Sequence, residues 1–262
     1  MFATTRSMLK LTAIVVALAA NACAAHGVRP VASAAPKLSC VGGVVRSTID
    51  VALYGACDRV NGDLLISVPE LTDLSALAQL RSVSGKLEIA GNAALDDLSG
   101  LERLEQVGQL SIHDNSDLDD LSGLESLEVA TSVEIRDNAE LTSLRGLSGL
   151  SRLERLTISH NGLFQTIGLS SLTEVGDLVV EGNAKLNSLE GLHSLAHARS
   201  VEIRNNPRLC GRRLLPALAR VDQSLTVSQN RGLSQPEVRQ LLGRVEHGLT
   251  PRTDNVASLE LR

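Results

Sequence analysis

The stretch LEIAGNAALDDLSGLERLEQV, residues 87–107, decides the fold of this chain. It opens with apolar residues two positions apart, the period of a β-strand, and continues with apolar residues three positions apart. A period of three fits neither a heptad nor an amphipathic α-helix, and it indicates a chain that turns around a central axis. The stretch therefore predicts one coil of a solenoid, made of a short strand and a tight apolar turn.

The same frame recurs from residue 63 to residue 233. Successive copies, aligned on the second apolar residue of each strand, lie 23, 23, 23, 23, 22, 23 and 24 residues apart. These anchor residues are Ile66, Ile89, Ile112, Ile135, Ile158, Val180, Ile203 and Val227. One copy cannot bury enough apolar surface to offset the ordering of its backbone, so neighbouring copies must stack. We predict a mainly β solenoid, a leucine-rich-repeat-like parallel β-helix of about eight rungs with short terminal caps.

An asparagine stands three residues after the anchor in every copy except the first, which has Pro69. The column consists of Asn92, Asn115, Asn138, Asn161, Asn183, Asn206 and Asn230. Because a buried amide needs hydrogen-bond partners, we interpret these residues as a structural ladder that satisfies backbone groups of the turns. Glycines at a fixed phase of the repeat fit tight corners or close backbone approach.

The motif Leu-x-Ile-x-x-Asn-x-x-Leu-x-x-Leu-x-Gly-Leu, preceded by Val-x-Gly, resembles the receptor L domain, a leucine-rich, right-handed β-helical module that also occurs in bacterial surface proteins. The resemblance covers roughly residues 38 to 233. Cys40 and Cys57 match the cysteine pair that closes the start of such domains, and the run NPRLC at residues 206–210 is similar to the family's Asn-Pro-x-Leu-Cys run. The sequence departs from the animal receptors of this family, because it has no furin-like region, membrane-spanning helix or kinase. The resemblance therefore does not imply receptor signalling.

The closest rival to this resemblance is the internalin-like class of bacterial leucine-rich repeats, whose usual period is 22. Only the copy from Ile158 to Val180 has that length here.

The N-terminus has the pattern of a targeting segment. Arg6 and Lys10 precede an apolar run, residues 11–20, that is too short to span a bilayer. We predict a signal peptide over residues 1–22. The following Cys23 resembles the lipid-carrying cysteine of a bacterial lipoprotein box, although a plain secretory cut after Ala22 stays open. Residues 23–37 are small, polar and Pro-containing, and we interpret them as a flexible tether. The expected location is the bacterial cell envelope, as an outer-membrane or cell-surface lipoprotein.

Export also bears on the other cysteines. In an oxidising compartment Cys40 and Cys57 are the natural disulfide pair, within an N-terminal cap at residues 38–60. Cys210 has no evident partner, and we expect a half-buried thiol in the last full repeat. A zinc site is not predicted, because no two cysteines have C-x-x-C spacing.

A helix should close the far end of the repeat solenoid, which we assign to residues 61–233. Ser234 and Glu237 have the spacing of a capping box, and an apolar helical face follows. We predict a C-terminal capping helix over residues 234–247, with a partner-binding helix as the alternative, and a loose tail over residues 248–262.

Outward strand positions form two neighbouring columns on the predicted sheet. The candidate binding face on these columns consists of Glu88, His113, Glu134, Arg136, Glu181, Glu202 and Arg204. The mixed charges favour a polar protein partner. The alternative is simple control of solubility and register, because acidic residues never occupy adjacent rungs within either column.

Composition and motifs exclude several other functions. Only 1% of residues are aromatic and the net charge is −5, which argues against sugar platforms and nucleic-acid grooves. The acidic corner at residues 114–120 lacks the EF-hand glycine, so neither calcium nor any other metal or cofactor is expected. A nucleophile elbow, a P-loop and a dinucleotide fingerprint are all missing, so no catalytic residues are predicted.

These observations favour a non-enzymatic, extracytoplasmic repeat scaffold that mediates protein–protein recognition at the bacterial cell envelope. We expect a protein partner, membrane attachment through the lipid anchor only, and neither nucleic acid nor a small-molecule substrate. The alternative is a structural or self-associating envelope component of the internalin-like type.

Overall fold

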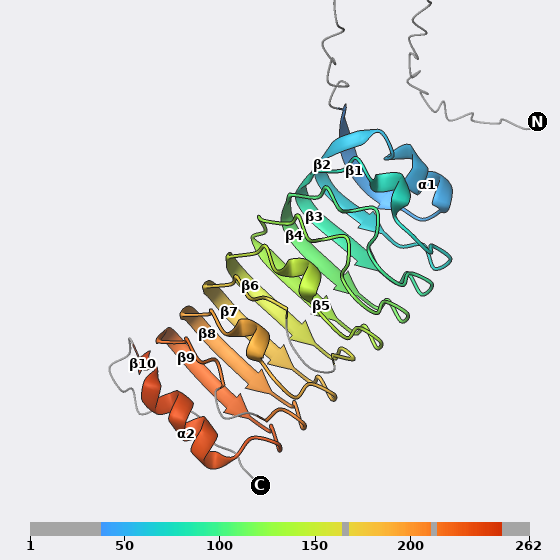
Figure 1. The fold of residues 1–262 in the computed structure, drawn as a ribbon. Helices are drawn as coiled ribbons and strands as arrows, with labels where there is room; N and C mark the ends of the chain where they lie inside the picture. Colours follow the sequence, from blue (N-terminus) through green and yellow to red (C-terminus); the bar gives the residue numbers. More distant parts are fainter. Residues whose placement is uncertain (1–37, 164–167, 211–213, 248–262) are drawn as a thin grey trace, which may run out of the picture. The chain divides into compact units, whose positions relative to one another are not determined.

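Parallel strands stack on one another from one end of the described chain to the other (Figure 1). The computed structural model describes residues 38–163, 168–210 and 214–247. Within these residues ten strands form one sheet, and each strand pairs with the next in sequence. The strands are β1 (Leu38–Val45), β2 (Cys57–Ile66), β3 (Ser82–Ala90), β4 (Gln106–His113), β5 (Ser132–Arg136), β6 (Arg152–Ser159), β7 (Glu174–Glu181), β8 (His197–Arg204), β9 (Arg220–Ser228) and β10 (Glu246–His247). The predicted mainly β solenoid is confirmed.

The strands stack in the register that the repeat predicts. The anchor Ile89 pairs with Ile66 on one side and with Ile112 on the other, and this alignment continues to Val227. All of the anchors are buried. The edge strand β1 adds one residue to the column of anchors, because Val45 pairs with the first anchor, Ile66.

Hydrogen bonds within each turn explain why its apolar residues recur at every third position. Leu101 donates its amide to the Leu98 carbonyl (3.1 Å), and Leu104 donates to the Leu101 carbonyl (2.8 Å). Bonds over three residues are those of a 3₁₀ turn, in which side chains three positions apart lie on the same side. All three leucines are fully buried. Some of the described turns form short 3₁₀ helices, namely η1 (Ser75–Leu77), η2 (Arg145–Leu147) and η3 (Glu190–Leu192).

The seven asparagines form a column of hydrogen bonds through the interior. Asn183 donates its backbone amide and its side-chain amide to Oδ1 of Asn206, at 3.1 and 3.2 Å. The same side-chain amide donates to the carbonyl of Ile158, in the preceding strand, at 3.0 Å. Every neighbouring pair in the column repeats the bond from backbone amide to Oδ1. The asparagines therefore join each rung to the next, as the sequence predicts.

The first copy of the repeat has no asparagine, so the column ends there with a different bond. The backbone amide of Val68 donates to Oδ1 of Asn92 at 2.7 Å. Pro69, which occupies the asparagine position of this copy, has no amide to donate. The column therefore starts with a bond from the residue before the proline.

Two glycines occupy corners where no side chain fits. Gly100 has φ +112° and Gly123 has φ +106°, both in the region that L-residues rarely adopt. A Cβ atom at Gly100 would overlap the backbone of Leu74 in the preceding rung, and one at Gly123 would overlap Leu98 in the same way. The fixed phase of these glycines therefore follows from the close approach of stacked turns.

Short helices follow the first strand and the last full rung. Helix α1 (Thr48–Leu53) begins at Ser47, whose hydroxyl accepts the Asp50 amide at 3.2 Å, and it buries Val51 in the core. Helix α2 (Gln235–Arg244) covers the last rung (Figure 1). It begins at the predicted capping box, in which the Glu237 carboxylate accepts the Ser234 amide at 2.7 Å. Among the described helices, none combines the length and the apolar content needed to cross a membrane.

Candidate functional site

The outer face of the sheet carries the seven residues of the predicted binding face in two adjacent columns. One column holds Glu88, Glu134 and Glu202, and the other holds His113, Arg136, Glu181 and Arg204. Because neighbouring strands lie about 4.8 Å apart, charged side chains on adjacent rungs are within reach of one another. The structure gathers the seven residues into two separate groups.

The first group centres on His113. Its Nε2 lies 2.9 Å from the Glu88 carboxylate, and its Nδ1 lies 2.7 Å from the Asp114 carboxylate. The ammonium of Lys86 approaches Glu88 to 3.1 Å. The hydrogen bond with His113, reinforced by Lys86, lowers the pKa of Glu88 below its ordinary value.

Arg136 extends this group to the next rung. Its guanidinium donates to Asp137 at 2.8 Å and lies 3.6 Å from Asp114 and 3.5 Å from Glu134. The hydrogen bond to Asp137, together with the nearby carboxylates, raises the pKa of Arg136 further. Asp114 touches both His113 and Arg136, so it connects the two rungs. We call this network the His113 cluster; its members are Lys86, Glu88, His113, Asp114, Glu134, Arg136 and Asp137.

The second group, which we call the Arg204 cluster, contains the other three predicted residues. The Arg204 guanidinium lies 2.6 Å from a Glu181 oxygen and 2.7 Å from a Glu202 oxygen. Glu181 comes from β7, whereas Glu202 and Arg204 come from β8. Two carboxylates on neighbouring strands therefore hold one guanidinium in place.

An uncharged strip separates the two clusters on the outer face. Thr157 and Ser159 on β6 and Val179 on β7 occupy the rungs between them. Ser159 is buried although it points outward, and the other two side chains are half-buried. The outer face thus presents two charged groups with a flat, small-residue strip between them.

A third charged group was not found from the sequence. Asp177 lies between Arg155, at 3.3 Å, and Arg199, whose Nε donates to it at 3.0 Å. The hydrogen bond from Arg199 lowers the pKa of Asp177. Arg155 and Asp177 belong to a third outward column, whose members stand two residues before those of the Glu88 column on each strand. Inspection of this third column in the sequence would have shown them. Arg199 lies at a register shift between β8 and β9, which the repeat frame does not reveal.

The acidic corners of the turns have a structural role. Asp120 accepts the Ser122 amide at 2.7 Å, and Asp97 accepts the Ser99 amide at 2.8 Å. Such bonds two residues along the chain are those of Asx turns, which fix the corner of each rung. Over the described ranges, His, Cys, Asp and Glu side chains form no group of three or more that could hold a metal ion.

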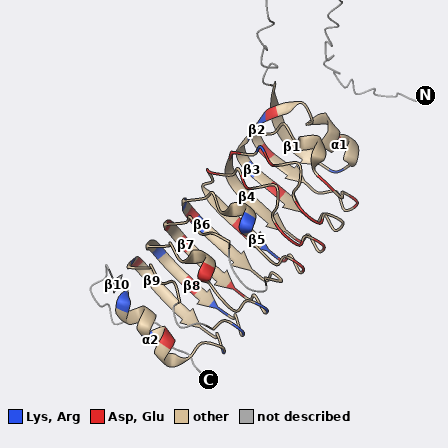
Figure 2. Cartoon of the chain, viewed as in Figure 1, with Lys and Arg blue, Asp and Glu red and all other residues tan. Residues whose placement is uncertain are grey.

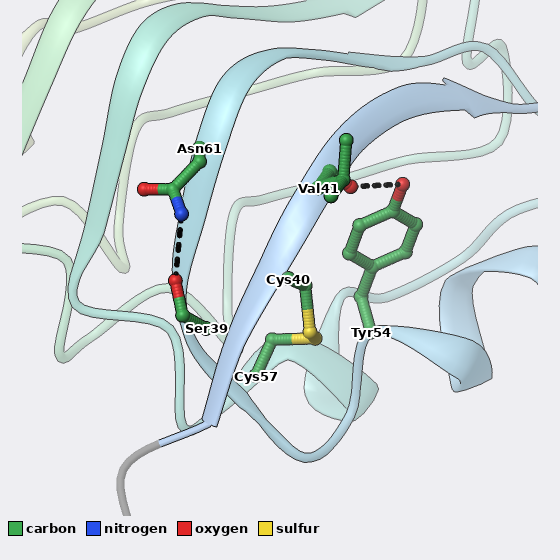
Figure 3. The surroundings of a disulfide bond; sticks show 6 residues. All are labelled: Ser39, Cys40, Val41, Tyr54, Cys57 and Asn61. Atoms are coloured by element: carbon green, nitrogen blue, oxygen red, sulfur yellow. Dashed lines mark hydrogen bonds between the residues drawn. A yellow bond between two sulfur atoms is a disulfide. The ribbon is translucent and has the colours of Figure 1, made fainter. Parts of the chain in front are cut away.

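Cys40 and Cys57 form a disulfide, with their Cα atoms 5.8 Å apart (Figure 3). It joins β1 to the first residue of β2, across the connection that contains α1. Nearby, the Tyr54 hydroxyl donates to the Val41 carbonyl at 3.2 Å. The predicted pairing is therefore present, and it closes the first rung of the solenoid.

Cys210 differs from the expectation of a half-buried thiol, because the structure exposes it. It lies one position after the buried Leu209, where the turn of the rung faces outward. Its sulfur is 3.6 Å from the Asn187 carbonyl of the preceding rung. The predicted signal peptide, the tether over residues 23–37, the lipidated Cys23 and the tail over residues 248–262 lie outside the described residues.

Charge is distributed unevenly along the solenoid (Figure 2). Residues 38–140 contain 19 acidic and 6 basic residues, whereas residues 141–247 contain 9 acidic and 13 basic residues. Only four of those 19 acidic residues belong to the His113 cluster. The acidic excess of the first half therefore lies mostly outside the paired charges of the outer face.

Comparison with known proteins supports the resemblance over part of the chain. No curated protein matches the sequence. The disulfide, the solenoid fold and the family match together are consistent with an exported, protein-binding repeat scaffold. The stretch that matches a family model contains the whole His113 cluster and ends before the Arg204 cluster. The pairing of each strand with the next nevertheless continues beyond that stretch to β9. Residues 56–146 match the family model of the receptor L domain.

Proposed function

We propose that this chain is a non-enzymatic, exported scaffold that binds a protein partner on the outer face of its sheet. The observation that carries the proposal is the state of two arginines, each held by carboxylates and still accessible. The side chain of Arg136 is 36% exposed and that of Arg204 is 41% exposed. A guanidinium has five N–H donors in a fixed plane. An arginine whose donors are partly used by carboxylates can therefore still donate hydrogen bonds to acceptors on a partner protein.

The spacing of these two arginines defines the partner that would fit. They occupy the same column three strands apart, on β5 and β8. At about 4.8 Å per strand, their backbone positions are about 14 Å apart along the sheet. The face therefore suits a rigid protein surface with two acidic or polar acceptors at that spacing. Because both arginines are already ordered, little side-chain entropy is lost on binding.

Binding through this face is tested by removing the two positive charges together. Arg136→Gln with Arg204→Gln removes both positive charges, keeps a polar side chain at each position and avoids placing new acids among existing ones. Chemical crosslinking of the full chain in its native cell, followed by mass spectrometry, should identify a partner that the double variant no longer captures. Arg103→Gln is the matched control, because Arg103 is exposed on a turn and bonds only to Gln79 among the described residues, at 2.8 Å. Capture that survives the double variant would refute the proposed face.

Location at a bacterial envelope through a lipid on Cys23 is the finer part of the proposal. It is supported by the lipoprotein-like box at residues 20–23 and by the small, polar stretch that follows. Cys23→Ser should release the protein from the membrane fraction, whereas Cys210→Ser, the control, should leave fractionation unchanged. Membrane fractionation that is unaffected by Cys23→Ser would contradict lipid anchoring.

A structural, self-associating envelope component is the second candidate. Exposed apolar side chains on the first rung favour it. Under this alternative, the crosslinking experiment would capture further copies of the chain and no other protein.

A further inference from the structure

The first rung exposes large apolar side chains, unlike most of the described chain. Five of the six exposed large hydrophobic residues in the described part lie on β1 and α1, and the sixth is Val129. The five are Leu38 (49% exposed), Val41 (80%), Val44 (51%), Ile49 (74%) and Leu53 (70%). We call them the first-rung patch. Both elements belong to the N-terminal end of the solenoid (Figure 1).

The opposite end is built differently. There α2 turns Val238 and Leu241 into the core, and the residues that it exposes include the polar Gln235, Arg239 and Gln240. Terminal repeats of a solenoid need a polar outer face to remain soluble. The C-terminal end meets this requirement. The described N-terminal end does not, so we expect another apolar surface to pack against the exposed side chains of the first rung.

This apolar surface does not have to be an added strand. The Tyr54 side chain lies on the side of β1 that faces away from Asn61 of β2, and its hydroxyl occupies the Val41 carbonyl (Figure 3). This contact blocks part of the open edge of the sheet, in the way that proteins protect edge strands. The patch is therefore suited to side-chain packing against another apolar surface.

We propose that the first-rung patch is the interface of a head-to-head homodimer. A fitting partner surface is apolar and nearly free of charge, and among the described residues the patch itself has both properties. Residues 38–66 contain two basic and three acidic residues, whereas residues 67–140 contain four basic and 16 acidic residues. Two copies can therefore meet at their first rungs without bringing the acidic turns together, since those turns lie further along each solenoid and charges beyond about 8 Å are screened at physiological salt.

The geometry also limits the assembly to two copies. A head-to-tail contact would place the patch on the polar outer side of α2, where the described residues offer no apolar match. A head-to-head contact uses the same surface on both copies, so it closes after one pairing. It buries both patches and leaves α2 as the polar cap at each far end. Val44 stands on the edge strand β1 in the same outward column as Glu88, two strands before it, and the Arg204 cluster lies further along the sheet. A contact through β1 and α1 therefore leaves both clusters open, and the dimer does not depend on the proposed function.

The test uses the oligomeric state of the full chain in solution. Sedimentation velocity over a range of concentrations should give a species of twice the chain mass. Ile49→Lys with Leu53→Lys should convert it to a monomer or raise the dimer dissociation constant at least tenfold. Lysine is a good helix former and both positions face solvent in the single chain, so α1 should stay folded. Circular dichroism and the melting temperature of each variant verify this.

Val129→Lys is the matched control, because Val129 is as exposed as Val44 (51%) and lies away from the first rung. It should leave the dimer intact. A disulfide trap in a Cys23→Ser, Cys210→Ser background adds a second readout: Ile49→Cys should form intermolecular disulfides, and Val129→Cys should not. A wild-type chain that remains monomeric at its solubility limit overturns the proposal, as does a dimer that survives the double lysine variant. Loss of binding to phosphatidylcholine vesicles by the same variant, with a monomeric wild type, would instead assign the patch to a bilayer.

Discussion

Asn115 accepts two hydrogen bonds from Asn92 through a single oxygen, one from the backbone amide and one from the side-chain amide, both at 3.0 Å. Both residues are fully buried. The contact explains why every described copy that follows Pro69 has an asparagine at this position. Only an amide side chain of this length offers an acceptor to the preceding rung and donors to its own surroundings.

Removing one asparagine should therefore cost more than an ordinary core truncation of its size. Asn115→Ala leaves the backbone amide of Asn92 and the carbonyl of Ile89 without their partner, and each unsatisfied buried group costs about 1–3 kcal/mol. We expect the free energy of unfolding to fall by about 2–4 kcal/mol, measured by urea denaturation.

Asn61→Ala is the control for this experiment, because Asn61 is exposed and its side-chain amide bonds only to the Ser39 hydroxyl among the described residues, at 2.8 Å. Its cost should stay within about 0.5 kcal/mol. Equal costs for the two substitutions would show that the column contributes no more than a surface hydrogen bond.

The same change, glycine to alanine, should have opposite effects at two positions. At Gly100 a methyl group would overlap the Leu74 backbone and sit at φ +112°, so Gly100→Ala should destabilise the fold by about 3 kcal/mol or more. At Gly243 nothing lies within 4 Å of an added Cβ, and the residue is helical. Gly243→Ala should therefore stabilise the chain by about 0.5–1 kcal/mol. Thermal melts of both variants measure the difference, and a Gly100→Ala protein with an unchanged melting temperature would refute the packing argument.

The sequence was sufficient for the features that depend on periodicity. The spacing of Ile66, Ile89 and the later anchors set the register, and the every-third leucines marked the core, because a stacked coil repeats each environment once per rung. The asparagine column could be predicted for the same reason. The disulfide was predicted on other grounds, namely the expected export of the chain and the resemblance of Cys40 and Cys57 to the cysteine pair of the receptor L domain.

Features that depend on side-chain reach between rungs could not be predicted in this way. The sequence placed seven ionisable residues on one face, but their division into the His113 and Arg204 clusters depends on which carboxylates each arginine reaches. Asp114 illustrates the problem: it lies in a turn with φ +56°, yet its carboxylate joins His113 to Arg136. The residue before each ladder asparagine in the described turns after Pro69 has positive φ. Gly91 and Gly182 are consistent with this conformation in the sequence, whereas Gln229 is a residue type that rarely adopts it.

The disulfide should stabilise the first rung by restricting the unfolded chain. Cys40 and Cys57 are separated by 17 residues, and closing a loop of that size contributes about 3 kcal/mol in the chain-entropy model. Cys40→Ala with Cys57→Ala should lower the free energy of unfolding by about that amount, measured by urea denaturation. Cys210→Ser, at an exposed free thiol, should leave stability unchanged. The opposite ranking, with Cys210→Ser the more harmful change, would indicate that the assigned bridge is not the stabilising one.

Acid should weaken the fold through carboxylates whose pKa values are lowered by partners on the outer face. Hydrogen bonds lower the pKa of Glu88 below 4.5 and that of Asp177 below 3.8, their ordinary values. Each carboxylate therefore binds protons less readily in the folded chain than in the unfolded chain. Its stabilising contribution is complete above the ordinary pKa and is lost as the pH falls through the lowered one.

Glu88→Gln with Asp177→Asn should therefore lower stability at about pH 7 and flatten the loss of stability between about pH 5 and pH 3. Urea denaturation across this range measures the slope. Glu190→Gln, which changes an exposed glutamate on η3, is the control and should keep the wild-type slope. If the double variant and the wild type lose stability in parallel as the pH falls, the contacts of Glu88 with His113 and Lys86 and those of Asp177 with Arg155 and Arg199 do not contribute to folding.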